Sequence, residues 1–169
     1  MKVVDTFLAN RKYVNESLNQ IKRHSETLSE EILRRYGKPD EIVYIERGGM
    51  VVARLLSDML GVKNVAAINA SYYLGVNERA SAVTIGQVPE LKVGSGYILL
   101  VDDVADTGKT LKKVAEAIKQ RHNVKVVTCT VFYKPRSEIK PDFFAKEVGN
   151  SKWVIFEYEE NEFGRSRRS

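Results

Sequence analysis

Two adjacent acids and a run of small polar residues follow the most apolar segment of the chain. Residues 98–101 are all apolar, and residues 102–110 then read Asp-Asp-Val-Ala-Asp-Thr-Gly-Lys-Thr. Gly108 relaxes the backbone, and the hydroxyl groups of Thr107 and Thr110 can donate to oxygen atoms. The N–H groups at the start of a helix point outward and attract anions. Because a helix is expected from about residue 110, residues 106–110 are predicted to bind phosphate.

The same run ends in Gly-Lys-Thr, as does the phosphate loop of nucleotide triphosphatases. That loop has the pattern GxxxxGK[ST], which requires glycine where this chain has Asp103. A carboxylate beside a triphosphate would repel it, so we reject this interpretation. Adjacent carboxylates instead suit the vicinal hydroxyls of a sugar, which they bind directly or through a shared Mg²⁺. Acids that merely end a strand and cap a helix would explain Asp106 alone, so the run predicts a ribose phosphate site.

Alternating strands and helices are expected to position this loop. Residues 17–20 have the form of a capping box, and Gly37 and Pro39 are stop signals, so a helix is expected over about 18–36. The four apolar residues at 42–45 indicate a strand covered on both faces. Helical periodicity returns over 51–60, and a short strand is expected over 65–69. Together these elements form a βαβ unit.

A second βαβ unit is expected around the polar loop itself. It consists of a strand over 97–101, the loop, a helix over about 110–121 and a strand over 125–133. Residues 71–95 are expected to form a mobile excursion with a weak β pattern near 82–85, and residues 153–156 a separate small flap. The pattern predicts an α/β fold with a doubly wound, mainly parallel sheet and helices on both faces. In such folds ligands bind beyond the carboxyl ends of the strands.

Length and composition exclude several classes of protein. A chain of 169 residues with 43% hydrophobic and 29% charged residues fits one globular domain. No apolar run approaches the ~18–20 residues of a membrane helix and no secretory signal is readable, so we expect a cytoplasmic location and no membrane partner. One cysteine and two histidines predict neither a disulfide nor a zinc site, and Cys129 is expected to be a buried thiol. The net charge of +5 falls to +2 without the three arginines of the last five residues, so nucleic acid is not an expected partner.

Residues 102–110 closely resemble the phosphoribosyl-pyrophosphate (PRPP) signature of the type I phosphoribosyltransferases. Residues 46–49, Glu-Arg-Gly-Gly, resemble the pyrophosphate loop of that family. Ser71-Tyr72 is similar to the Ser-Tyr of the flexible catalytic loop in its 6-oxopurine branch. The resemblance implies the type I phosphoribosyltransferase fold and one domain over 1–169. This domain would have a core at about 38–134, a hood from about 135–163 plus the N-terminal segment, and a basic tail at 164–169.

The resemblance also implies roles for individual residues. Asp102 and Asp103 would bind the ribose hydroxyls and Mg²⁺, and residues 106–110 would hold the 5′-phosphate. The expected catalytic residues are Arg47, which would neutralise the leaving pyrophosphate, and Asp106, which would act as the general base at purine N7 while N9 reacts. The residues expected to bind PRPP are Arg47, Gly48, Gly49, Ser71, Tyr72, Asp102, Asp103, Asp106, Thr107, Gly108, Lys109 and Thr110.

Lys134 and Trp153 are candidates for contacting a base. In the resemblance, a lysine after this strand donates to the exocyclic O6 of a 6-oxopurine, an aromatic residue stacks on the ring, and Val154 offers backbone groups. A lysine donor suits a carbonyl acceptor and opposes adenine, whose N6 amino group is itself a donor. Without the resemblance, a solvated lysine and a core tryptophan would be the ordinary interpretation.

The resulting hypothesis is a purine salvage enzyme. It would transfer the 5-phosphoribosyl group of PRPP to N9 of guanine, hypoxanthine or xanthine with Mg²⁺, giving the nucleoside 5′-monophosphate and pyrophosphate. A homodimer or tetramer is expected from the family alone. The alternatives are a PRPP-binding regulator without catalysis and a phosphoribosyltransferase for adenine or a pyrimidine. The second Mg²⁺ ligand is left open among Glu157, Glu159 and Glu160, and a pyrophosphate role for Arg136 is not expected because the segment after the lysine is short.

Overall fold

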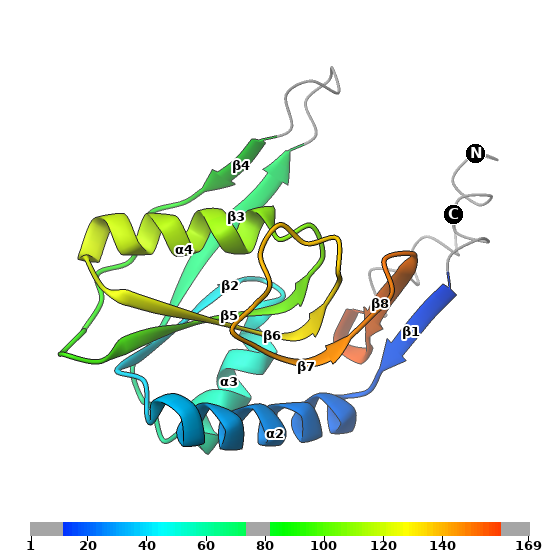
Figure 1. Ribbon diagram of the computed structural model, residues 1–169, viewed down its shortest axis with the longest axis horizontal. Helices are drawn as coiled ribbons and strands as arrows, with labels where there is room; N and C mark the ends of the chain where they lie inside the picture. Colours follow the sequence, from blue (N-terminus) through cyan, green and yellow to red (C-terminus); the bar gives the residue numbers. More distant parts are fainter. Residues whose placement is uncertain (1–11, 74–81, 160–169) are drawn as a thin grey trace.

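The computed structural model of the protein describes residues 12–73 and 82–159, which form a large sheet, a small sheet and three long helices (Figure 1). In chain order the described elements are β1 (Lys12–Glu16), α2 (Leu18–Tyr36), β2 (Glu41–Glu46), α3 (Gly49–Met59), β3 (Val65–Tyr73), β4 (Ala82–Ile85), β5 (Tyr97–Ala105), α4 (Lys109–His122), β6 (Lys125–Tyr133), β7 (Phe143–Glu147), β8 (Lys152–Phe156) and the short 3₁₀ helix η1 (Glu157–Glu159). The basic tail, Glu160 and residues 74–81 of the predicted excursion lie outside the described residues. None of the described helices is long and apolar enough to cross a membrane.

The large sheet has the strand order β4-β3-β2-β5-β6-β7. Neighbouring strands are parallel except β3 and β4, which are antiparallel. This is the predicted α/β fold with a mainly parallel sheet. β2 and β5, which precede the two glycine-containing loops, lie side by side at its centre. Both loops therefore emerge at the same edge of the sheet.

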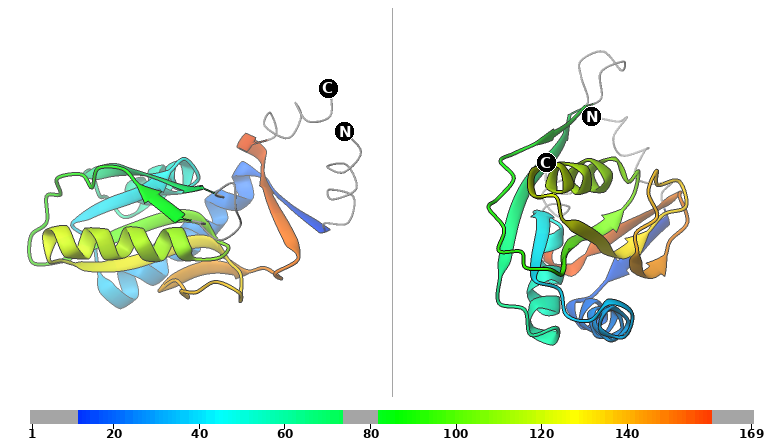
Figure 2. Two further views of the ribbon diagram at one scale, coloured as in Figure 1. Left: turned by 90° about the horizontal axis from the view of Figure 1, so that it is seen from above. Right: turned by 60° about the vertical axis from the view of Figure 1, so that its left-hand side comes forward.

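Helices cover both faces of the large sheet, as the continuous apolar runs predict (Figure 2). Along β5, Leu99 and Val101 pack in the core that α2 and α3 share, whereas Ile98 and Leu100 pack against α4. Successive strand residues point to opposite faces, so an uninterrupted apolar run is what a strand with two covered faces requires. All four side chains are fully buried.

Two strands extend further than the sequence predicts. β5 continues through Asp102 and Asp103 to Ala105, where a loop was expected, because this stretch pairs with β6 and places Asp102 opposite Thr130. β3 continues past residue 69 to Tyr73, where it pairs with β4 instead of entering a loop. The predicted end of β5 is wrong because aspartates are rare in strands, and pairing within the sheet overrides that preference. The predicted end of β3 is wrong because its pairing with β4 is not visible in the local pattern.

α2 has the bounds that its sequence predicts. The Ser17 hydroxyl accepts the N–H of Gln20 at 3.3 Å, and the Gln20 side chain accepts the N–H of Ser17 at 2.9 Å, which completes the capping box. Glu157 adds a second cap, because its Oε2 accepts the N–H of Leu18 at 2.7 Å. The helix ends before Gly37, which has φ +73°. The start of α2 is therefore tied to the residues that follow β8.

β1 and β8 pair in parallel and form the small sheet (Figure 1). β8 corresponds to the predicted flap, whereas β1 has no counterpart in the sequence prediction. β7 is also absent from it: this strand lies within the predicted hood but joins the large sheet beside β6. The buried carboxylate of Glu16 on β1 lies 3.6 Å from His24 Nε2 on α2 and 3.5 Å from Lys146 Nζ on β7. Glu16 therefore fastens the small sheet to the rest of the molecule.

Cys129 is a buried thiol in β6, as predicted from its place in an apolar strand. The residue is 0% exposed, and burial raises the pKa of the thiol above its ordinary value. We expect a thiol reagent to leave the native protein unlabelled and to modify it once per chain after denaturation, since a thiol reacts as the exposed thiolate. Intact-mass spectrometry with and without urea measures this. Rapid labelling of the native protein would contradict the burial.

Candidate active site

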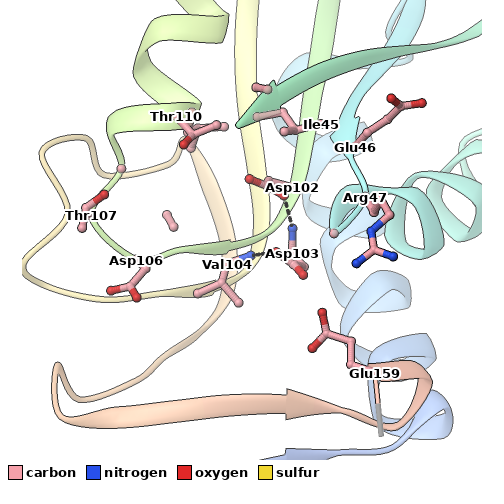
Figure 3. Close-up of a pocket in the computed structure, with 15 residues that line it drawn as sticks. Ile45, Glu46, Arg47, Asp102, Asp103, Val104, Asp106, Thr107, Thr110 and Glu159 are labelled. Carbon is pink, nitrogen blue, oxygen red and sulfur yellow. Dashed lines mark hydrogen bonds between the residues drawn. The ribbon is translucent and has the colours of Figure 1, made fainter. Parts of the chain in front are cut away.

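The loops that follow β2 and β5 enclose a cavity of about 350 Å³ at the carboxyl edge of the large sheet (Figure 3). The sequence predicts that both loops act at one site, and the structure brings them together. The predicted PRPP-binding residues that line this cavity are Arg47, Gly48, Asp102, Asp103, Asp106, Thr107, Gly108 and Thr110. We call it the phosphate cavity.

Four other predicted PRPP-binding residues lie outside the lining of this cavity. Gly49 is buried behind it, against the backbone of Val101. Lys109 is the first residue of α4. Ser71 and Tyr72 belong to β3, where they pair with β4 and do not open a loop. From this strand it is Ala70 that lines the cavity.

Asp102 and Asp103 are consecutive residues near the end of β5 (Figure 3). Asp102 Oδ1 accepts the N–H of Asp103 at 2.9 Å, and Asp103 Oδ1 accepts the N–H of Val104 at 2.6 Å. Burial raises the pKa of Asp102 well above its ordinary value, and the charge of Asp103 raises it further. Burial also raises the pKa of Asp103, although the hydrogen bond from Val104 opposes this effect. Two carboxylates held together in this way favour a cation or hydroxyl donors beside them.

The acidic pair suits a hard cation such as Mg²⁺. Magnesium in proteins is commonly bound by one or two carboxylates together with substrate oxygens and water. A Cβ at Gly48 would lie 2.5 Å from Asp103 Oδ2, so the glycine keeps the space beside this carboxylate open. Among the residues that the structure describes, no group of three or more His, Cys, Asp and Glu side chains could hold a metal ion. A metal at the pair would therefore need further oxygens, which a phosphate ligand supplies.

The loop after β5 leads into the N-terminus of α4. Gly108 precedes the helix with φ +73°, a conformation that favours glycine. Its N-cap residue, Gly108, has no side chain that could cap the helix, and the N–H groups of a first helical turn are oriented to bind anions. Thr107 and Thr110 lie at this end of the phosphate cavity, and Arg47 lies across it, beyond Asp103 (Figure 3). The cavity therefore offers anion-binding groups at both ends.

A second cavity, of about 270 Å³, adjoins the first. We call it the base cavity because the residues that the sequence predicts to contact a base line it. The two cavities share Asp103, Val104, Asp106 and Glu159. The remaining walls of the base cavity are Lys134, Trp153, Val154 and Phe156. The structure therefore brings the three predicted base-contacting residues to one place, next to the acidic pair.

Lys134 is almost completely buried, with 3% of the residue exposed. Its Nζ lies 3.1 Å from Asp106 Oδ2 and 5.8 Å from the ring centroid of Trp153. A buried ammonium group needs a counter-charge, and Asp106 supplies it. The ordinary alternatives of a solvated lysine and a core tryptophan do not apply, because Lys134 is buried and both side chains line the base cavity.

Arg136 contacts Asp106 in a way that the sequence does not predict. Its Nε donates to Asp106 Oδ1 at 2.7 Å, and its Nη2 contacts the same oxygen. The carboxylate is therefore held by Lys134 on one oxygen and by Arg136 on the other. A Pro-Arg-Ser sequence after the lysine is the only signal for this contact in the chain.

The late acids separate into different roles. Glu157 caps α2, whereas Glu159 lines both cavities. Between them, the Tyr158 hydroxyl is buried and has no hydrogen-bond partner among the described residues. Burial and the charge of Asp103 raise the pKa of Tyr158 above its ordinary value. No sequence signal distinguishes these three neighbours, because the difference lies in which way each side chain points from η1.

An open α/β sheet with an acidic pair, a glycine loop and a helix N-terminus at its carboxyl edge defines a class of proteins that bind a sugar phosphate. A family model described as the phosphoribosyl transferase domain matches residues 15–162. The chain belongs to the phosphoribosyltransferase family and is thus a glycosyltransferase.

Curated relatives and solved structures agree with this assignment. Xanthine-guanine phosphoribosyltransferase from Cereibacter sphaeroides is 31% identical over 159 residues, which cover 90% of this chain and 90% of the relative. The enzyme of that name from Nitratidesulfovibrio vulgaris is 30% identical over 149 residues, which cover 88% of this chain and 86% of the relative. Purine phosphoribosyltransferase from Pyrococcus horikoshii has a TM-score of 0.74 at 28% identity and covers 86% of this chain and 93% of its own. Helicobacter pylori xanthine-guanine-hypoxanthine phosphoribosyltransferase has a TM-score of 0.79 at 26% identity, with 92% and 99% covered.

Proposed function

We propose that this protein transfers the 5-phosphoribosyl group of PRPP to N9 of a 6-oxopurine in purine salvage, giving the nucleoside 5′-monophosphate and pyrophosphate. The observation that carries the proposal is the buried Lys134 ammonium group beside Trp153 in a cavity that adjoins the acidic pair. A fixed donor selects a ring with a carbonyl acceptor, as guanine, hypoxanthine and xanthine have at C6. The bases in the names of the relatives belong to this class.

The phosphate cavity supports PRPP as the donor substrate. Asp102 and Asp103 accept hydrogen bonds from the ribose hydroxyls, and residues 106–110 bind the 5′-phosphate with backbone N–H groups and threonine hydroxyls. At the other end, Arg47 and the backbone of Gly48 and Gly49 receive the pyrophosphate. Ser71 and Tyr72, which lie on β3, are kept in the proposal as PRPP-binding residues.

The acidic pair is also the proposed site of Mg²⁺. Asp102 and Asp103 would hold the ion together with oxygens of PRPP, as their oxygen donors and the open space beside Asp103 favour. Bound there, Mg²⁺ would neutralise charge that develops on the pyrophosphate. Glu159 lines the same cavity, whereas Glu157 caps α2, so Glu159 is the proposed ligand of a second Mg²⁺ ion.

The reaction requires these residues mainly to position the reactants and to balance charge. The bond between the anomeric carbon and pyrophosphate breaks through a cationic transition state, so Arg47 stabilises the leaving group. Trp153 and Lys134 orient the purine so that N9 faces that carbon. Asp106 receives the proton at N7 as N9 reacts. A cytoplasmic location and a homo-oligomer complete the proposal.

Pyrophosphate release with PRPP and Mg²⁺ tests this function, with hypoxanthine, guanine, xanthine, adenine, uracil and orotate offered in parallel. We expect release with 6-oxopurines only. If adenine or a pyrimidine were the best substrate, the assignment of the PRPP site would stand and the assignment of the base as a 6-oxopurine would be wrong. If no base gave pyrophosphate release but PRPP binding were measurable, the protein would instead be a PRPP-binding regulator.

Lys134→Gln tests the base assignment separately. The variant keeps a side chain of similar polarity but loses the charge, and its amide can accept from an amino group as well as donate to a carbonyl. We expect kcat/KM for hypoxanthine to fall by about tenfold or more, and the preference for hypoxanthine over adenine to narrow. The exposed Lys140→Gln in the same loop is the control and should change neither value. An unchanged preference in the Lys134 variant would show that this side chain does not read the base.

A further inference from the structure

The carboxylate of Asp106 is held at both oxygens, by two side chains that come from one loop. Lys134 Nζ lies 3.1 Å from Oδ2, and Arg136 Nε lies 2.7 Å from Oδ1, with its Nη2 in contact with the same oxygen. Of these two cations, Lys134 lines the base cavity, whereas Arg136 is not among the described residues that line either cavity. The guanidinium therefore contacts Asp106 without forming part of the described wall of either cavity.

Backbone contacts hold Arg136 in this position. Its own N–H donates to the Asn150 side chain at 3.0 Å, which anchors it to the turn before β8. The N–H of Ser137 donates to the Lys134 carbonyl at 2.9 Å, so the loop turns tightly between the two cations. The N–H of Glu138 donates to the Thr107 carbonyl at 2.8 Å, which fastens this loop to the phosphate loop.

The packing of the two loops is close enough to fix their relative position. A Cβ at Gly108 would overlap the Ser137 hydroxyl, so the two loops are in contact at this residue. Gly108 also has a φ of +73°, a conformation that favours glycine. Asp106 lies two residues before this contact, and Arg136 lies one residue before it on the other loop. The ion pair therefore lies beside a direct contact between the two loops.

We infer that Arg136 is a positioning residue that fixes the orientation of the Asp106 carboxylate, so that Oδ2 faces Lys134 and the purine. This inference rests on the proposed function. The terminal torsion of an aspartate is broad, so a carboxylate without a second contact rotates easily. Two guanidinium N–H groups of Arg136 on Oδ1, together with the Lys134 ammonium group on Oδ2, restrict that rotation, because each oxygen then has its own cation. Arg136 thus acts on the reaction only through Asp106, and it does not bind PRPP or pyrophosphate.

A double-mutant cycle with Asp106→Asn tests this inference. Asp106→Asn alone is expected to lower kcat by about 100-fold, the usual contribution of a general base. Arg136→Ala alone is expected to lower kcat by about tenfold, which is less than the roughly 100-fold that a 1 Å misplacement can cost, because Lys134 still contacts Asp106. The KM for PRPP should stay within about twofold in both variants. In the double variant, the loss should match that of Asp106→Asn within about twofold, because residues that act through one group are not additive.

Three results of this cycle would overturn the inference. One is a full additional loss in the double variant, which would show that Arg136 acts independently of Asp106. Another is a raised KM for PRPP with unchanged kcat in Arg136→Ala, which would show direct substrate binding. The third is normal kcat in the single variant Arg136→Ala while the single variant Asp106→Asn has a lowered kcat. If Asp106→Asn itself retains normal turnover, the proposed role of Asp106 fails instead, so the two failures are distinguishable.

Two further variants separate positioning from stability. Lys112 contacts Glu138 of the same loop at 3.6 Å, so Lys112→Ala removes a cation from this junction without touching Asp106. It should leave kcat unchanged. Arg136→Gln keeps most of the side-chain length and guards against a loss of packing in the alanine variant. It should show the same kcat loss as Arg136→Ala, and normal kcat in Arg136→Gln would contradict the inference.

Discussion

Asp102→Asn is expected to remove most of the turnover of PRPP and, at the same time, to raise the melting temperature of the protein. The variant loses a charge that the proposed function assigns to the ribose hydroxyls and Mg²⁺, which should lower kcat by about 100-fold. The folded state of the variant is nevertheless more stable, because asparagine removes a carboxylate whose ionisation is unfavourable there. Burial and the charge of Asp103 raise the pKa of Asp102. The asparagine keeps an oxygen that can accept the N–H of Asp103. A gain of about 1 kcal/mol would raise the melting temperature by roughly 2–4 °C.

The pH dependence of this effect follows from the sign of the shift. A raised pKa means that the folded protein binds the proton more tightly than the unfolded chain, so ionisation costs folding free energy. That cost is absent below the ordinary pKa of 3.8 and is complete above the raised pKa of Asp102. The advantage of Asp102→Asn over the natural protein should therefore be smallest in acid and should grow with pH.

Melting curves in EDTA from about pH 4 to about pH 8 measure this trend in the metal-free protein. Asp58→Asn on α3 is a matched control, because Asp58 is exposed and its ion pair with Arg54 spans 3.7 Å. It should alter stability by less than about 0.5 kcal/mol and leave turnover unchanged. An Asp102 variant that melts below the natural protein at the upper end of this range would contradict the account of the acidic pair.

Gly49→Ala is expected to destabilise the fold strongly. A Cβ at this position would lie 2.5 Å from the Val101 carbonyl oxygen and 3.2 Å from Asp102 Cα. The obstructing atoms are backbone atoms of β5, which is fixed between β2 and β6, so neither side can move away cheaply. Overpacking of this kind costs about 3 kcal/mol. The same displacement would shift Asp102, so we expect the folded fraction to lose activity as well.

Urea unfolding of Gly49→Ala measures the loss directly. Gly149→Ala is its control, because a Cβ at Gly149 meets nothing within 4 Å and the residue has no left-handed φ. The control should fall within about 0.5 kcal/mol of the natural protein. Equal unfolding free energies for the two variants would show that α3 moves away from β5 without cost.

The sequence predicts best where local signals and tertiary structure agree. Residues 18–36 carry a capping box, an apolar face and a glycine stop, and α2 has these bounds. The prediction fails where pairing decides. Residues 12–16 are mostly polar and form β1 only because β8 lies beside them, about 140 residues away along the chain.

The site shows the same division. The polar run at 102–110 has a spacing that is specific enough to predict the phosphate cavity. The contact of Arg136 with Asp106 depends instead on how two loops pack, which local patterns do not encode. Likewise, Glu157 and Glu159 are equivalent in the sequence, and only the direction of each side chain from η1 separates the helix cap from the cavity wall.

The pairing of β1 with β8 has a consequence for how such a chain is made and how it diversifies. The acidic pair and both glycine loops come from the middle of the chain, whereas Trp153 and Val154 lie on a strand whose only partner in the small sheet is β1, near the other end. During synthesis the two loops of the phosphate cavity are therefore made before Trp153 and Val154, and Glu159, which lines both cavities, is made last. Substitutions in β1 and β8 can also reshape the base cavity while the central loops stay unchanged. Under the proposed function, Trp153 and Val154 could thus change without a change in the donor site, whereas Lys134 and the residues that both cavities share could not.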